Sequence, residues 1–193
     1  MKRIIMFLIV HALLCVSKGH AQSEKAYFYG VDFSKVKVYG AGESVDKFAE
    51  AFEKINILIT SEADKYDFSK LIGKDMESVL SPMLDKLSKC KYEGMKTYDN
   101  VKNHINFQAI VNDYKLPQKE GRGYVLVAVL LDKGKKEAVY NLLTFDIESR
   151  KIINSSEVVG KPGGFGLRNF WAGSLYKIIN GYKLDDKGVA VKR

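Results

Sequence analysis

The feature that most constrains the fold is an unbroken apolar run near the middle of the chain. Residues 124–131 read Tyr-Val-Leu-Val-Ala-Val-Leu-Leu and follow Gly121-Arg122-Gly123. A half-exposed strand alternates apolar and polar side chains, whereas a strand that is apolar on both faces must be covered on both sides. The run therefore predicts a central strand of a sheet with other elements packed against both of its faces.

Two further strands are predicted to fold back beside this run. Residues 132–135 (Asp-Lys-Gly-Lys) have the composition of a tight turn, and residues 139–147 carry apolar side chains on both faces. The chain turns again over 146–150, and strand character returns over 152–159. Strands joined by such short turns pair antiparallel, so we predict a three-stranded antiparallel meander over about residues 124–159.

The first part of the chain predicts a strand followed by a helix. Within residues 31–39 two valines alternate with lysines, which is the period of a half-buried strand. Ser44 is a favourable N-cap, and apolar side chains then recur at helical spacing over 44–55. Residues 55–60 are apolar and β-branched, and they fit either a short strand or the end of this helix.

The middle of the chain predicts two shorter helical segments. The first covers residues 76–88 and is interrupted by Pro82. Proline is tolerated in the first turn of a helix but not in its interior, so either the helix kinks there or Ser81 caps a new helix. The second begins near Phe107 and must end before Pro117.

The last helix carries the longest apolar stripe. Its members are Leu167, Phe170, Trp171, Leu175, Ile178 and Ile179. Only a sheet face or another large apolar surface can cover such a stripe, so we predict that this helix packs on the meander, with Trp171 in the core and Gly181 ending the helix. The fold class that follows is a single α/β domain, leaning toward α+β. Its mixed sheet would be covered by the helices near 44–55, 76–88 and 167–180.

The first residues have the layout of a secretory signal peptide. Lys2 and Arg3 precede an apolar run over residues 4–16, and small and polar residues end at Ala21. That run is shorter than the roughly twenty residues that span a bilayer. We predict cleavage after Ala21, a mature domain over residues 22–193 and a periplasmic or extracellular location. No later stretch is apolar for long enough to predict a transmembrane span.

The two cysteines have different predicted fates. Cys15 lies within the signal, where it is either one more apolar residue or a lipid-attachment site, and the large Leu14 before it disfavours lipidation. Cys90 would be the one cysteine of the mature chain, so an intramolecular disulfide is excluded. We expect its thiol to be either buried and inert or exposed.

The charge is basic but scattered. Without residues 1–21 the chain keeps 28 lysines and arginines against 23 acids, a net charge of +5. The lysines occur in separated pairs, whereas nucleic-acid binding requires a clustered basic face, so no nucleic-acid partner is predicted. Weak peripheral attraction to an anionic membrane remains an open alternative.

The residues of the mature chain do not assemble a recognisable catalytic or metal site. His104 is its one histidine, and no Gly-x-Ser-x-Gly turn is present, so a nucleophilic triad is not predicted. One histidine and one cysteine do not make a zinc centre, and the calcium-loop pattern is missing. We therefore predict no catalytic residue, metal or cofactor. A hydrolase that uses two carboxylates stays open, because any two acids could face a cleft.

The glycine-rich turn over residues 160–166 is the strongest candidate for a ligand site. Glycines before a helix N-terminus expose backbone N–H groups that can cradle an anion, and basic side chains would add attraction. The candidate binding residues are Lys161, Gly163, Gly164 and Arg168. The alternative, which we favour, is a tight strand-to-helix crossover in which glycine supplies positive φ and close packing.

Two segments resemble known envelope domains. They are YVLVAVLLD (residues 124–132) and LLTFDIESRKI (residues 142–152), which together resemble the second half of the curli-assembly (CsgG-type) and TolB amino-terminal-type domains, with Arg150 where those domains have glycine. The ending GGFGLRNFWAGSLYKI also resembles uncharacterised secreted proteins of Gram-negative gut bacteria. The resemblance implies an α/β sandwich with an envelope function and no catalysis, and it implies no particular functional residue.

The leading functional hypothesis is an exported, non-enzymatic protein of the cell envelope that binds a partner protein or self-associates. The first alternative is a binder of a small ligand, an anion or a glycan at the turn over residues 160–166. The second alternative is the carboxylate-dependent hydrolase.

Overall fold

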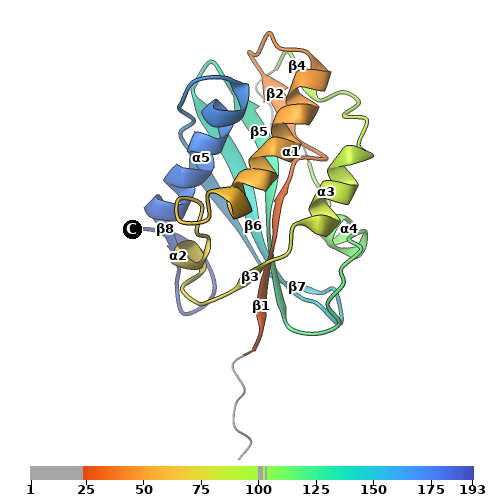
Figure 1. Cartoon of the computed structure of the whole chain (residues 1–193), viewed down its shortest axis with the longest axis vertical. Helices are drawn as coiled ribbons and strands as arrows, with labels where there is room; N and C mark the ends of the chain where they lie inside the picture. The colour runs from red at the N-terminus through yellow and green to blue at the C-terminus, as the bar shows by residue number, and fades with distance from the viewer. Residues whose placement is uncertain (1–23, 100–101, 103) are drawn as a thin grey trace, which may run out of the picture.

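The computed structural model describes residues 24–99, 102 and 104–193 (Figure 1). The predicted signal peptide (residues 1–21), with Cys15, lies outside the described residues. Within them the chain forms a seven-stranded mixed sheet, five helices and a separate two-stranded hairpin. The prediction of an α/β fold with a mixed sheet and an antiparallel meander is confirmed.

The central position of the long apolar run is also confirmed. The strands of the sheet are β1 (Ala26–Asp32), β2 (Lys37–Tyr39), β3 (Glu77–Ser78), β4 (Lys96–Thr97), β5 (Arg122–Asp132), β6 (Glu137–Asp146) and β7 (Ile152–Gly160). One edge of β5 pairs in parallel with β1 and, further along, with β2, while the other edge pairs antiparallel with β6. β7 pairs antiparallel with β6, and β3 and β4 lie beside β1 and β2.

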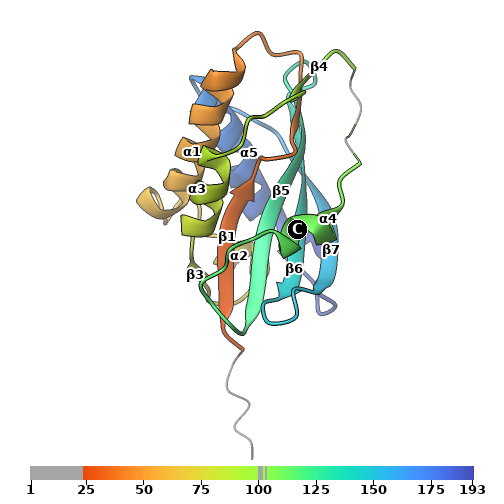
Figure 2. The ribbon, with the colours of Figure 1, turned by 90° about the vertical axis from the view of Figure 1, so that its right-hand side faces the viewer.

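The helices cover both faces of this sheet, but unequally. They are α1 (Val45–Ser61), α2 (Ser69–Ile72), α3 (Ser81–Ser88), α4 (Phe107–Asn112) and α5 (Leu167–Gly181). Figure 2 shows α1, α3 and α5 on one side of the sheet and α4 on the other. As predicted, α5 packs on the meander, against β7 and β6, and it also contacts α1. Trp171 is fully buried between these elements.

The first helix is confirmed and is longer than the predicted range. The Ser44 side chain accepts a hydrogen bond from the backbone N–H of Lys47 at 3.4 Å, and the helix continues to Ser61. The ambiguous residues 55–60 are therefore helical. Ile55 and Ile59 are buried, so the apolar surface of this stretch faces the core as a helix rather than as a strand.

The helix predicted over residues 76–88 is wrong in its first part. Residues 77–78 form β3, and the backbone N–H of Val79 donates to the carbonyl of Phe28 in β1 at 2.8 Å. Helix α3 begins at Ser81, with Leu80 rather than Ser81 as the capping residue and Pro82 in the first turn. Proline lacks an N–H, which the first turn does not need, so the helix starts beside it instead of kinking there.

The strand predicted over residues 31–39 is interrupted. Residues 33–36 turn, with the Val36 N–H donating to the carbonyl of Phe33 at 3.1 Å. The Val31 N–H donates to Oδ1 of Asn56 in α1 at 2.8 Å, and Asn56 Nδ2 donates to the Val31 carbonyl at 2.9 Å. The register of β1 against β5 shifts between Phe28 and Val31. A side-chain amide thus replaces part of the sheet's hydrogen bonding, and this break positions the polar site described below.

The C-terminal end differs from the sequence prediction in two ways. Helix α5 includes Gly181, and the chain leaves it at Tyr182 in an extended conformation. It continues into a hairpin of β8 (Tyr182–Leu184) and β9 (Ala190–Lys192) that the sequence did not indicate, and α2 was likewise not predicted. No helix in the described part of the chain is both long and apolar enough to cross a bilayer.

Candidate functional site

The four candidate residues of the glycine-rich turn lie along one surface hollow. Lys161, Gly163, Gly164 and Arg168 line a hollow of about 450 Å³ between the turn and the residues that follow α1. Lys65 and Tyr66, which follow α1, and Tyr176 and Lys177 of α5 also line it. The sequence placed these four residues together because they are near neighbours in the chain. Lys65 and Lys177 add charge that the sequence analysis did not assign to the site.

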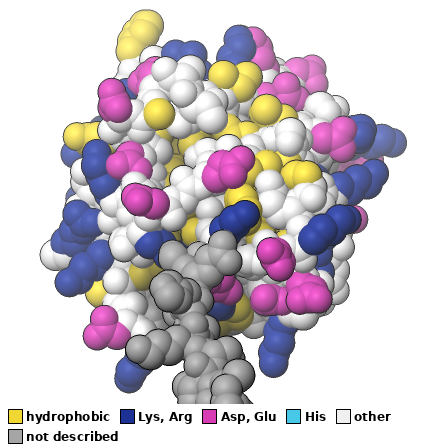
Figure 3. Space-filling view, turned by 60° about the horizontal axis from the view of Figure 1, so that its bottom comes forward, with side chains coloured by type: hydrophobic (Ala, Val, Ile, Leu, Met, Phe, Trp, Pro, Cys, Tyr) yellow, Lys and Arg dark blue, Asp and Glu magenta, His cyan; other side chains and the backbone are white. Residues whose placement is uncertain are grey.

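The hollow is strongly basic. Four cationic side chains line it, and its one carboxylate belongs to Glu62, which pairs with Lys65 at 3.1 Å. The hydrogen bond to Glu62 raises the pKa of Lys65, so the lysine keeps its proton at neutral pH. Phe165, at the tip of the turn, is 96% exposed. On the face shown in Figure 3, acidic side chains lie among the lysines and arginines.

The glycines are explained mainly by close packing. A Cβ on Gly160 would overlap the carbonyl oxygen of Ser174, and a Cβ on Gly173 would overlap that of Gly163. Gly164 has a φ of +121°, which favours glycine. The Gly163 N–H donates to the carbonyl of Phe170 at 2.9 Å, so it is not available to an anion. The basic side chains, rather than an open row of N–H groups, are what this hollow offers.

Two alanine substitutions test this assignment. Gly160→Ala is expected to destabilise the fold by about 1–3 kcal/mol, because the new methyl must push strand β7 away from α5. Gly163→Ala introduces a methyl with no atom within 4 Å, at a backbone conformation that alanine can adopt, so its stability should match or exceed the wild type. Urea denaturation of both variants measures the difference, and equal stabilities would refute the packing explanation.

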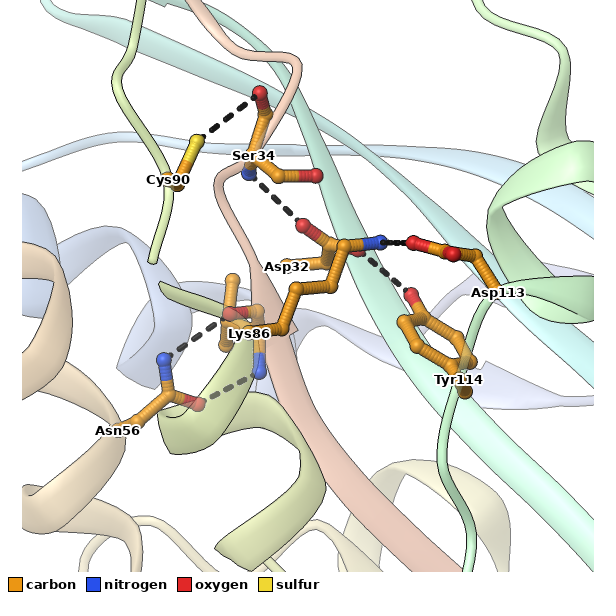
Figure 4. A network of polar contacts seen from close by, with 8 residues as sticks. Asp32, Ser34, Asn56, Lys86, Cys90, Asp113 and Tyr114 are labelled. Carbon is orange, nitrogen blue, oxygen red and sulfur yellow. Dashed lines mark hydrogen bonds and ion pairs between the residues drawn. The ribbon is translucent and has the colours of Figure 1, made fainter. Parts of the chain in front are cut away.

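A second polar site lies where β1 breaks, and sequence reasoning missed it. Asp32, the last residue of β1, is fully buried (Figure 4). Its Oδ1 accepts from the Ser34 N–H at 2.7 Å, while Oδ2 accepts from the Tyr114 hydroxyl at 2.8 Å and from Lys86 Nζ at 3.0 Å. The one signal in the sequence is a carboxylate between the apolar residues Val31 and Phe33 of a strand.

This network joins three parts of the fold. Lys86 comes from α3, and its Nζ also lies 3.8 Å from the carboxylate of Asp113 and 4.6 Å from the centre of the Tyr114 ring. Burial, with the neighbouring Asp32 carboxylate, raises the pKa of Tyr114 well above its ordinary value. Tyr114 therefore stays protonated and keeps donating to Asp32. The arrangement fixes α3 and the segment after α4 against the end of β1.

Two hollows adjoin this network and share Ser34, Lys35 and Cys90. The larger, of about 620 Å³, is also lined by Lys86, His104, Ile105 and Asp113. The smaller, of about 270 Å³, is also lined by Lys37, Lys91 and Tyr92. Cys90 is half-buried, between the two states expected for it, and its thiol donates to the Ser34 carbonyl at 3.7 Å. Cys90 and His104 thus line the same hollow.

Asp32 and Asp113, the two acids at the larger hollow and the adjoining network, do not form a pair suited to hydrolysis. Asp32 is inaccessible and both of its oxygens accept hydrogen bonds, while Asp113 is exposed and lies on the far side of the Lys86 ammonium. A glycosidase mechanism needs two carboxyl groups that both reach the substrate. Among the described residues, no group of three or more His, Cys, Asp or Glu side chains is placed to hold a metal ion.

Comparison with known proteins finds no relative of this chain. A scan against protein-family models, a search of the curated proteins and a search of the solved structures each find no match to this chain.

Proposed function

We propose that this protein is exported to the cell envelope and works by binding rather than by catalysis, with the basic hollow at the glycine-rich turn as its contact site for an anionic partner. The observation that carries the proposal is the charge of the hollow. Lys161, Arg168 and Lys177 face it together with Lys65, and its one acid is already paired with Lys65. Such a site attracts negatively charged molecules from solution, and this attraction steers their association with the protein.

The export half of the proposal rests on the sequence. A basic start, an apolar run too short for a membrane span and a small-residue cleavage site over residues 1–21 support secretion. The resemblance of residues 124–132 and 142–152 to envelope domains supports the same location. A partner in the envelope would be a protein, a glycan or a lipid surface that carries negative charge, or another copy of this chain.

The expected affinity is modest. Each lysine or arginine held near an anionic surface contributes about 1 kcal/mol, and burying Phe165 against a partner would add about 2 kcal/mol. Association entropy opposes these gains, so a single hollow supports weak binding unless several copies act together.

Charge reversal at the turn tests the proposal. In a thermal-shift assay, a soluble polyanion such as heparin at ten times its Kd should raise the Tm of the wild type by about 3–5 °C. A neutral sugar such as maltose should not change the Tm. The double variant K161E/R168E should keep its basal Tm and lose the polyanion shift.

The matched control is K151E/K183E, which makes the same change in net charge at exposed lysines away from the hollow. It should keep most of the polyanion shift. If both double variants lose the shift equally, net charge alone explains the binding and the hollow is not the site. If the wild type shows no shift with any polyanion, the proposed function fails.

A further inference from the structure

The smaller hollow beside the Asp32 network has features that the proposed function does not use. We call it the Cys90 hollow and define it by Ser34, Lys37, Cys90, Lys91 and Tyr92. It is formed by the break between β1 and β2 and by the chain that follows α3. Part of the surrounding chain is anchored by the ion pair between the buried Asp32 and the partly exposed Lys86 (Figure 4). The walls of the hollow are therefore held by the fold rather than by a free loop.

Two residues that line this hollow carry a buried hydroxyl group without a hydrogen-bond partner. Four buried side-chain polar atoms in the described part of the chain lack a hydrogen-bond partner, and two of them are Ser34 Oγ and Tyr92 Oη. Tyr92 is only 5% exposed, and burial raises its pKa above the ordinary value, so its hydroxyl keeps its proton. A buried hydroxyl without a partner destabilises the fold, and native proteins rarely keep one without a reason.

The charged side chains that line this hollow are mostly hydrogen-bond donors. Three lysines line the hollow, against one carboxylate, Glu93. Lys37 Nζ donates to the carbonyl of Gly94 at 2.6 Å, which restricts the position of this ammonium. Ammonium and hydroxyl groups are the donors that bind an anion with several acceptor oxygens.

We propose that the Cys90 hollow binds a phosphoryl or sulfuryl group. The neighbouring larger hollow shares Ser34 and Cys90, and it adds the apolar side chains of Ile105, Ala109 and Ile110. It offers room for the body of a molecule whose anionic group occupies the Cys90 hollow. The ligand class is thus a small phosphorylated or sulfated molecule, with the free inorganic anion as the simplest member.

Cys90 itself provides the assay, because it lines both hollows. The purified protein is treated with iodoacetamide, a neutral reagent, and alkylation at Cys90 is followed by peptide mass spectrometry, which separates it from Cys15. Inorganic phosphate, sulfate and glycerol 3-phosphate are compared with sodium chloride at equal ionic strength. At ten times its Kd a bound anion should slow the reaction about tenfold, because about one molecule in eleven remains free.

The outcomes separate the sources of the anion. Protection by inorganic phosphate or sulfate as strong as that by the ester identifies the free oxyanion as sufficient, and stronger protection by glycerol 3-phosphate identifies an organic phosphate. Either result supports the proposal. Protection by none of the three beyond that of chloride, at concentrations up to about 50 mM, overturns it, since a site with a Kd of about 5 mM would be nine-tenths occupied there.

Two variants locate the site. K37M/K91M should lose the protection, whereas K161E/R168E should retain it. The anion proposal can therefore fail while the proposed function stands, and the proposed function can fail while the anion proposal stands.

A third variant, Tyr92→Phe, removes an unpaired hydroxyl. Its Tm should equal or exceed that of the wild type, while the protection weakens severalfold. A lower Tm with unchanged protection would show that this hydroxyl serves the fold and not an anion, and would count against the proposal.

Discussion

Lys86→Met is expected to destabilise the protein by about 3–5 kcal/mol, because it leaves the buried carboxylate of Asp32 without its cation. Asp32 has no exposure to solvent, and Lys86 Nζ lies 3.0 Å from its Oδ2. Methionine keeps most of the volume of the lysine stem, so packing changes little. The free energy of unfolding from urea titration at pH 7 measures the effect.

The matched control lies one turn further along the same region of the chain. Lys89 forms an ion pair with Asp85, but both side chains are exposed, so Lys89→Met should cost less than about 1 kcal/mol. The double variant D32N/K86M removes both charges together and should be more stable than the sum of the two single effects predicts. If Lys86→Met costs no more than Lys89→Met, the buried network does not hold α3 against β1.

The segments with strong periodicity could be predicted from the sequence. The run over residues 124–131, its two return strands and the stripe of α5 each contain enough apolar residues to define a period and a buried face. Their burial depends mainly on composition and spacing, which a sequence shows directly. The mixed α/β class follows from these segments, because a strand that is apolar on both faces requires two covering layers.

The edge of the sheet could not be predicted in the same way. β3 and β4 are two residues long, which is too short to show a period, and they form because β1 and β2 offer unpaired backbone groups beside them. The break after Asp32 depends on Asn56, whose amide reaches Val31 across 25 positions of sequence. Such long-range polar contacts decide local structure at residues 31–39 against the strand pattern.

The two candidate sites differ for a similar reason. The glycine-rich turn brings Lys161 and Arg168 together through local chain geometry, so neighbouring residues in the sequence were sufficient to suggest it. The Asp32 network joins side chains 54 and 82 positions apart. Spacing along the chain carries no information about such contacts. Only the fold can assemble them.

Alkaline unfolding is the second large effect that we expect. Burial raises the pKa of five tyrosines above the ordinary value, and these are Tyr29, Tyr92, Tyr114, Tyr124 and Tyr140. The unfolded chain releases each of these protons near pH 10, whereas the folded protein retains them. Their contribution to stability is therefore complete below about pH 10 and is lost as the pH rises toward the folded-state pKa values.

Two of these residues are enough to make the effect large. Tyr114 and Tyr140 are almost fully buried, and the Tyr140 hydroxyl lies 2.8 Å from Ser174 Oγ inside the core. Each loses about 1.4 kcal/mol of stabilisation for every pH unit above 10, so the pair removes about 3 kcal/mol at pH 11. The other three tyrosines add to this loss, and a domain with a stability of 5–15 kcal/mol should unfold between about pH 11 and 12.

The measurement combines two signals over pH 8 to 12. Tyrosinate absorbance near 295 nm follows ionisation, and far-ultraviolet circular dichroism follows the fold. We expect the last part of the absorbance rise to coincide with the loss of the dichroism signal, because the buried hydroxyls ionise only when the chain opens. Tyr140→Phe removes one of these groups, so the stability of this variant should fall less steeply with pH above 10 than that of the wild type. Complete ionisation of all tyrosines with an unchanged dichroism spectrum would show that these hydroxyls are not closed off from solvent.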